Sequence, residues 1–261
     1  MTNPITITVD EHIALVTLDR PPVNAVNRAT LAAIRDAFRS LDDRRDVRAA
    51  VFTATGTRAF MGGADLDSVG DRGGADSTPP TDVTDSGRVA RDAMWAITDC
   101  AVPVVGAING PAVGAGVAFA TCCDILLAAD HAWFGTLEIN VGLLGASAHL
   151  MQLVGRHKAR EMFLLGERVT AQELHRLGVI REVLPADQLL PAAMEVARVL
   201  AQKSPIAMRL AKDSMNRIEG LKLKDAYQTE QDYTNRLLGF EDSLEAREAF
   251  KNKRDPEWKW R

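Results

Sequence analysis

The sequence predicts an α/β fold in which short strand–helix units come first and a helical C-terminal third follows. Three observations carry this prediction. Apolar and polar residues alternate over Ile5–Asp10, which is typical of a half-buried strand. Two further predicted strands are each followed by a glycine-rich turn. Beyond Val183 the apolar residues recur at helical spacing, and the chain shows no internal repeat of fixed period.

The first half of the chain supplies the predicted strands. After strands over 5–10 and 13–18, Asn27 is a good helix cap, and the apolar residues that follow it keep helical spacing. Four later apolar runs predict strands over 47–55, 103–108, 123–129 and 132–134. Helices are expected over 89–99, after Gly114, and over 205–218, 221–238 and 243–251.

One segment differs in kind from the rest. Residues Asp67–Arg88 are rich in Gly, Pro, Asp and Ser, and they cannot bury enough apolar area to offset the entropy of ordering. We expect a long mobile loop here. Such a loop inside a compact domain is usually a lid or a disordered excursion.

The composition excludes several classes of protein. The net charge is −4, with Lys and Arg scattered along the chain, which argues against a nucleic-acid groove or a surface for anionic membranes. No apolar run approaches the ~20 residues of a membrane-spanning helix, and residues 1–10 lack the pattern of a secretory signal. The three cysteines form neither a disulfide framework nor a metal-ligand spacing, so we expect a reducing, cytoplasmic location and no metal.

Two glycine-rich turns, Ala59–Leu66 and Asn109–Gly116, are the first candidates for a functional site. Glycine lets a ligand approach main-chain N–H groups closely, and the start of a helix adds unpaired N–H donors. Two such turns brought together could hold a developing oxyanion, although ordinary tight turns explain the same pattern. Glu138 lies in an apolar stretch with two glycines. If buried it is a candidate base with a raised pKa, and if exposed it is an ordinary loop residue.

Five segments, in their order and spacing, resemble the motifs of the crotonase superfamily, also called the enoyl-CoA hydratase/isomerase family. Each motif alone is a weak signal, but together they cover nearly the whole chain. The segment Arg20–Asn27 resembles P-x-x-N-A-hydrophobic-N/D, and Ala59–Leu66 resembles A-F-x-x-G-A-D-hydrophobic. The other segments that resemble family motifs are Pro103–Asp124, Phe134–Gly142, and Leu165–Ala171 with Gly178–Ile180.

The resemblance implies a right-handed superhelix of ββα turns, with a core over residues 1–195 and a helical trimerisation region over 196–261. Family members bind an acyl-CoA thioester and stabilise its enolate with two backbone N–H groups. No permanently bound cofactor is implied, since coenzyme A is part of the substrate. The implied assembly is a homotrimer or a dimer of trimers, and the implied context is fatty acid metabolism.

By motif position, the two oxyanion donors are the N–H groups of Gly62 and Ala115, and Glu138 is the family's second glutamate. Because the chemistry needs backbone geometry, bulk at Gly62 is expected to matter more than charge. Hydratases of the family have their first glutamate where this chain has Ala118. One carboxylate suits proton transfer between two carbons, so double-bond isomerisation is favoured. The alternatives are hydration by Glu138 with water and a non-catalytic acyl-CoA-binding homologue.

The resemblance also implies residues that bind the substrate near the adenine end of CoA. These are Ala25 in the loop after the second strand, and Ala64, Asp65 and Leu66 at the end of the first glycine turn. We interpret Asp65 as structural, because its place in the motif suits a side chain that holds the turn in position.

Two further regions complete the predicted site. His149 lies where the family's P-G-A-G-G-T-Q-R stretch is replaced, and it is either a second acid/base or an ordinary helix-face residue. Phe250 and Lys253 lie in a segment that resembles the family's A-F-x-E-K-R. The resemblance implies that they reach the CoA phosphate of a neighbouring subunit, although Lys253 suits a solvated basic tail equally well.

Overall fold

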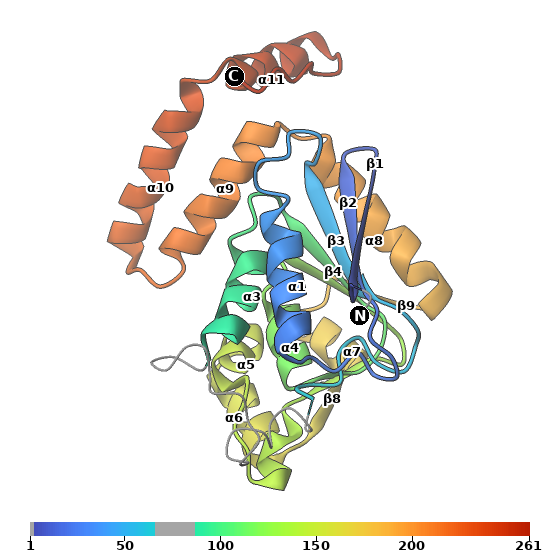
Figure 1. Ribbon diagram of the computed structural model, residues 1–261. Coiled ribbons are helices and arrows are strands. Elements are labelled where there is room, and N and C mark those ends of the chain that lie inside the picture. The colour runs from blue at the N-terminus through green and yellow to red at the C-terminus, as the bar shows by residue number, and fades with distance from the viewer. Residues whose placement is uncertain (1–2, 66–86) are drawn as a thin grey trace.

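The computed structural model describes residues 3–65 and 87–261 (Figure 1). The loop predicted over Asp67–Arg88 therefore lies outside the described residues up to residue 86, and Leu66 lies outside them too. Within the described residues, one six-stranded sheet and one three-stranded sheet organise the fold.

The larger sheet contains, in spatial order, β1 (Ile5–Asp10), β2 (Ile13–Leu18), β3 (Ala49–Ala54), β4 (Val104–Ile108), β6 (Ile125–Ala129) and β9 (Glu182–Leu184). The first two strands form an antiparallel hairpin, and the other neighbours pair in parallel. Every residue of β3 and β4 is buried, as expected for parallel strands that are covered on both faces.

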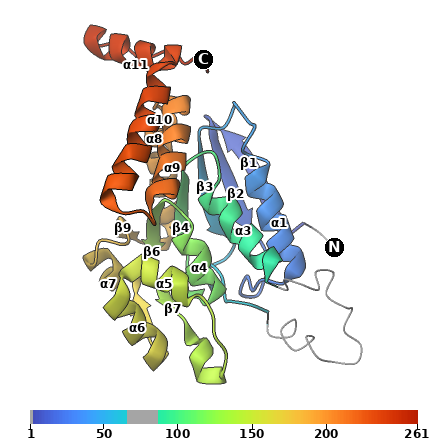
Figure 2. The same ribbon diagram turned by 90° about the vertical axis from the view of Figure 1, so that its left-hand side faces the viewer.

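Helices cover both faces of this sheet (Figures 1 and 2). On one face, α1 (Arg28–Arg39) packs against α3 (Arg88–Thr98). On the other, α8 (Ala186–Ala201) contacts β3 and β4. The predicted cap of the first helix is confirmed, since the side chain of Asn27 accepts a hydrogen bond from the Thr30 N–H at 3.0 Å.

The smaller sheet lies next to the second glycine turn. It contains β5 (Ala112–Val113), β7 (Trp133–Gly135) and β8 (Arg168–Thr170), with β7 in the middle. The turn then enters α4 (Ala115–Thr121), and the strand β7 leads into η1 (Leu137–Val141), a short 3₁₀ helix. This sheet therefore brings the start of α4 beside the segment that carries Glu138.

Three helices follow η1 before the last strand of the larger sheet: α5 (Ser147–Val154), α6 (Arg156–Leu165) and α7 (Ala171–Arg176). The strand predicted over 123–129 begins only at Ile125, because the N–H of Cys123 still donates to the Ala120 carbonyl at the end of α4. The helix predicted over 205–218 coincides with α9 (Pro205–Ile218). The last two predicted helices correspond to α10 (Leu223–Leu238) and α11 (Glu241–Asn252).

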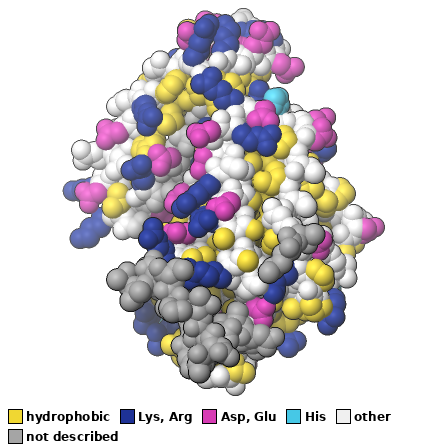
Figure 3. Space-filling model, viewed as in Figure 1, with side chains coloured by type: hydrophobic (Ala, Val, Ile, Leu, Met, Phe, Trp, Pro, Cys, Tyr) yellow, Lys and Arg dark blue, Asp and Glu magenta, His cyan; other side chains and the backbone are white. Residues whose placement is uncertain are grey.

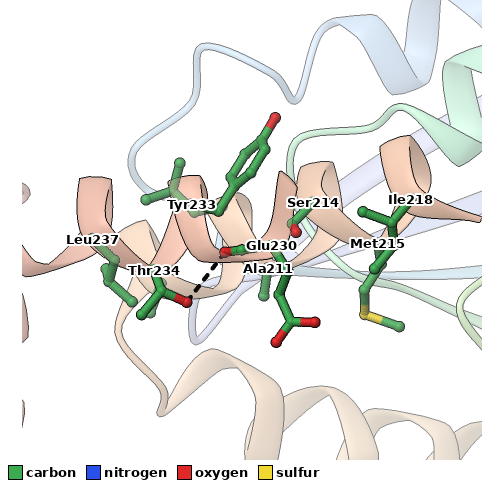
Figure 4. Close-up of a pocket in the computed structure, with 10 residues that line it drawn as sticks. Ala211, Ser214, Met215, Ile218, Glu230, Tyr233, Thr234 and Leu237 are labelled. Atoms are coloured by element: carbon green, nitrogen blue, oxygen red, sulfur yellow. Dashed lines mark hydrogen bonds between the residues drawn. The ribbon is translucent and has the colours of Figure 1, made fainter. Parts of the chain in front are cut away.

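The C-terminal helices extend away from the sheets (Figure 2). Helix α10 has no buried residue and packs on α9 across a groove of about 270 Å³ (Figure 4). The Tyr233 hydroxyl of α10 donates to the Asp213 carboxylate of α9 at 2.5 Å and ties the pair together. Helix α8 crosses the boundary predicted between residues 195 and 196. The division into two regions and the trimer or hexamer stay predictions.

The surface carries charges of both signs. Acidic and basic side chains are interspersed over the upper part of the face in Figure 3, in keeping with the scatter of Lys and Arg along the sequence. None of the helices in residues 3–65 and 87–261 has the length and apolar character needed to cross a membrane. The cytoplasmic location stays a prediction.

Candidate active site

The two glycine-rich turns lie side by side. Met61 and Ala112 form a parallel β-bridge, and the N–H of Val113 donates to the Met61 carbonyl at 2.9 Å. Gly116 supports this close approach, because a Cβ at this position would overlap the Met61 carbonyl oxygen. The structure therefore brings together the two turns in which the sequence places the oxyanion donors.

The predicted donor on the first turn needs correction. The N–H of Gly62 donates to the Val23 carbonyl at 2.8 Å, so this amide is committed to the fold and is not free for a ligand. Gly62 is required for packing instead, since a Cβ there would lie 3.0 Å from both the carbonyl oxygen and a methyl group of Val23. The assignment of the Gly62 N–H as a free donor is therefore wrong, and the role of the turn in binding an oxyanion stays a prediction.

The backbone N–H of Ala64, on the same turn, is not used in a hydrogen bond of the fold among the described residues. Ala64 forms a parallel β-bridge with Val26, in which the neighbours Gly63 and Asp65 make the hydrogen bonds, at 2.9 Å each. The N–H of Ala64 therefore faces away from Val26. On the second turn, Ala115 is the first residue of α4, where N–H groups have no intrahelical partner. Neither amide donates to another residue in the described part of the chain.

Glu138 lies in η1, with its carboxylate next to the turn that carries Ala115. Its carboxylate is packed against two glycines: a Cβ on Gly114 would overlap Oε1, and a Cβ on Gly145 would lie 3.1 Å from it. The other oxygen, Oε2, is buried and has no hydrogen-bond partner among the described residues. Burial raises the pKa of Glu138 above its ordinary value. Such a carboxylate is a stronger base than an exposed one and is suited to accepting a proton from carbon.

A cavity of about 460 Å³ joins these groups. Its lining includes Gly62–Ala64 of the first turn, Val113, Ala115 and Ala118 of the second turn and α4, and residues between Leu137 and His149. Ala118 is fully buried on the cavity wall. Among the described residues that line the cavity, only Glu138 has a carboxylate.

His149 also lines the cavity, from helix α5. The ring is half-buried, and burial lowers the pKa of His149 below its ordinary value. Within residues 3–65 and 87–261 no hydrogen bond is formed by this imidazole. The structure thus places the predicted His149 on a helix and, at the same time, on the wall of the site.

Asp65 pairs with Arg20 at 2.6 Å, and the same guanidinium donates to the carbonyl of Ala25 at 2.6 Å. This bridge ties the first glycine turn to the loop before α1, which fits the structural interpretation of Asp65. Ala25 is thereby placed beside the turn, whereas Leu66 lies outside the described residues.

Phe250 and Lys253 are not near the cavity of their own chain. Phe250 is 83% exposed on α11, and Lys253 follows the end of that helix. Figure 1 shows α11 at the opposite end of the molecule from α5 and α6. A contribution to the site of a neighbouring subunit stays a prediction.

The cysteines are free and buried. Burial raises the pKa of both Cys100 and Cys122 to about 11, and that of Cys123 well above its ordinary value, so the thiols stay protonated. In the part of the chain that the structure describes, no group of three His, Cys, Asp or Glu side chains is arranged to hold a metal ion.

Comparison with known proteins identifies the family. Residues 8–261 match the model of the enoyl-CoA hydratase/isomerase family. The chain belongs to this family. An enoyl-CoA hydratase from Bacillus anthracis has the same fold, with a TM-score of 0.90 at 28% sequence identity over 99% of this chain and 100% of that one. The α/β fold of the crotonase type, with a helical C-terminal region, is therefore confirmed.

Two relatives from the enoyl-CoA hydratase/isomerase family carry different activities in their names. The (7aS)-7a-methyl-1,5-dioxo-2,3,5,6,7,7a-hexahydro-1H-indene-carboxyl-CoA hydrolase of Mycobacterium tuberculosis is 36% identical over 96% of this chain and 99% of its own length. The 2,3-dehydroadipyl-CoA hydratase of Escherichia coli is 31% identical, and the match covers 96% of each chain. The chain is thus an acyl-CoA enzyme of the family, whose members differ in reaction.

The contact between Gly114 and Glu138 makes a testable prediction. Gly114 has φ +52°, and Gly114→Ala adds a methyl group that overlaps Oε1 of Glu138. We expect the carboxylate to shift by about 1 Å and turnover to fall by about 10²-fold. Gly178→Ala is the matched control, because Gly178 has φ +77° but open space around it. Equal losses of turnover in the two variants would contradict the prediction.

Proposed function

We propose that the chain moves a double bond along an unsaturated acyl-CoA by transferring a proton between two carbons through an enolate. The single carboxylate among the described lining residues carries this proposal. Among the described lining residues only Glu138 is acidic, and the fully buried Ala118 stands where the hydratase pattern has a second glutamate. A site with one base can take a proton from one carbon and return it to another, and this is all that isomerisation requires.

The geometry supports a role for each group. The thioester oxygen would accept hydrogen bonds from the N–H groups of Ala64 and Ala115. Glu138 would break the C–H bond at the α-carbon, and the electron pair would pass to the thioester oxygen as the enolate forms. The same carboxylic acid would then deliver the proton to the γ-carbon, so that the double bond ends between the α- and β-carbons. The two amides matter most in the enolate, where the oxygen is charged.

Two separate assays test the proposal, one with a 3-enoyl-CoA and one with the 2-enoyl-CoA of the same chain length. We expect the 3-enoyl-CoA to be converted into its conjugated isomer without a change in mass. The readout is mass spectrometry together with the absorbance of the conjugated thioester. Conversion of the 2-enoyl-CoA into a product heavier by one water, with no isomerisation, would overturn the proposal.

Hydration is the second candidate, and the names of the relatives favour it. The E. coli relative is a hydratase, and the M. tuberculosis relative is a hydrolase, which also uses water. In this reading Glu138 would take a proton from a water molecule rather than from carbon. A non-catalytic acyl-CoA-binding protein would bind both thioesters in these assays and convert neither.

A further inference from the structure

The cavity wall is apolar except at two side chains. The described residues that line it are Gly, Ala, Val, Leu and Met, with the exception of Glu138 and His149. The carboxylate of Glu138 lies beside Gly114 and Gly145, next to the turn that carries the free amide of Ala115. His149 is the third residue of α5, four positions after Gly145. A ligand in the cavity therefore meets a second polar side chain, from a different element.

The imidazole of His149 has no partner in the fold. No hydrogen bond joins it to Glu138 or to any other residue in 3–65 and 87–261. Its ring nitrogens are not buried, whereas Oε2 of Glu138 is buried and has no partner among the described residues. His157 is exposed to water, and each of the other three histidines has a ring nitrogen within hydrogen-bond distance of a neighbouring acceptor. For example, Nδ1 of His175 lies 2.8 Å from the carbonyl oxygen of Ile180. A neutral imidazole offers one N–H donor and one acceptor nitrogen. A ligand that fills the cavity would exclude water from the ring, and a buried polar group is normally paired.

We propose that His149 hydrogen-bonds an oxygen atom of the acyl group, so that the preferred substrate is an acyl-CoA with a keto or hydroxyl oxygen in addition to its thioester carbonyl. This inference rests on the proposed function in taking an acyl-CoA as the ligand of the cavity and in the roles given to the backbone amides and Glu138. His149 is then a specificity-determining residue. The thioester oxygen is assigned to the backbone amides, and the Glu138 carboxylate faces the carbon that loses its proton. The imidazole of His149, the remaining polar side chain, would have no hydrogen-bond partner on a plain hydrocarbon chain.

Binding of saturated, unreactive thioesters tests this inference without any turnover. The probes are an acyl-CoA of fixed length and a series in which one keto group is moved along the same chain. We expect the wild-type chain to bind one keto position more tightly than the plain acyl-CoA, on the order of 10- to 100-fold. Isothermal titration calorimetry gives the ratio of the two dissociation constants.

Variants assign the preference to the imidazole. His149→Phe keeps an aromatic ring of similar shape without hydrogen-bonding atoms, and the ratio is expected to fall to about one. His149→Gln keeps a donor and an acceptor and is expected to retain part of the preference. His157→Phe is the control, because His157 is exposed on α6 and does not line the cavity.

Two results would overturn the inference: a wild-type ratio near one at every keto position, or a preference that persists in His149→Phe. Failure of the proposed function gives a different result. In that case the keto preference is present in the binding data, but no enoyl-CoA is isomerised. Circular dichroism of each variant shows whether it is folded. If His149→Phe is not folded, the ratio measured for His149→Gln still tests the inference.

Discussion

Replacing Glu138 with Gln is expected to lower turnover by about 10²–10⁴-fold, the usual contribution of a general base, with acyl-CoA binding largely retained. Gln has nearly the same shape as Glu and fits the space between Gly114 and Gly145, but it cannot take up a proton. No other carboxylate among the described lining residues can replace it. Single-turnover kinetics and a binding isotherm separate the loss of chemistry from a loss of affinity.

The pH dependence gives a second readout of the same group. Glu138 must be deprotonated to act as a base, and burial raises its pKa above the ordinary value of 4.5. Turnover of the wild-type enzyme is therefore expected to fall as the pH drops through this raised pKa, above the range in which exposed glutamates titrate. The residual turnover of Glu138→Gln should lack this acidic limb.

Glu167→Gln is the matched control, because Glu167 is exposed and does not line the cavity. It is expected to leave both the rate and the pH profile unchanged. A Glu138→Gln enzyme that turns over its substrate at the wild-type rate would show that another group is the base. The same would follow if the acidic limb of the profile persisted in that variant.

The sequence motifs located the two glycine turns, but they did not reveal which backbone N–H groups within the turns are free to donate. The motifs placed the two glycine turns together, and the β-bridge between Met61 and Ala112 agrees. They did not reveal that Gly62 donates to Val23. Which of several neighbouring amides is free depends on the direction of each N–H in the β-bridge between Val26 and Ala64, and residue identity does not encode that direction.

The short elements that follow η1 in the chain were the hardest to predict. The strands β8 and β9 have three residues each, which is too short for a visible alternation. Helix α5 begins after Ala146, which has φ +56° and offers no side-chain cap, so its start has no sequence signal. By contrast, the long helix α9 begins at a Ser-Pro pair and was predicted at both ends.

The second large effect is expected in stability. Lys212→Met should lower the free energy of unfolding by about 3 kcal/mol, the lower end of the range for breaking a buried ion pair. Lys212 of α9 is only 6% exposed, and its ammonium group donates to the Asp124 carboxylate at 2.7 Å. The ammonium also donates to the carbonyls of Ile97 and Val102, at 3.1 and 3.2 Å.

The loss should be large because several groups depend on one ammonium. Met fills a similar volume but removes the ammonium donor from all three acceptors, although the Ile97 carbonyl still accepts from the Cys100 N–H at 3.3 Å. The carboxylate keeps one partner, since Oδ2 of Asp124 also accepts from the Val104 N–H at 2.7 Å. The Asp124 side chain is 30% exposed, so water relieves part of its cost, and for this reason we expect the lower end of the range.

Lys158→Met is the matched control for this effect. Lys158 pairs with Glu161 on the surface of α6 at 2.7 Å, and such a pair contributes less than about 1 kcal/mol. Urea denaturation of both variants gives the two free energies of unfolding. Equal losses would show that the buried pair contributes no more to stability than the exposed pair. The pair joins α9 to the connection between α4 and β6, whereas the amide of Ala115 lies at the opposite end of α4. Substrate binding at low urea should therefore survive in Lys212→Met.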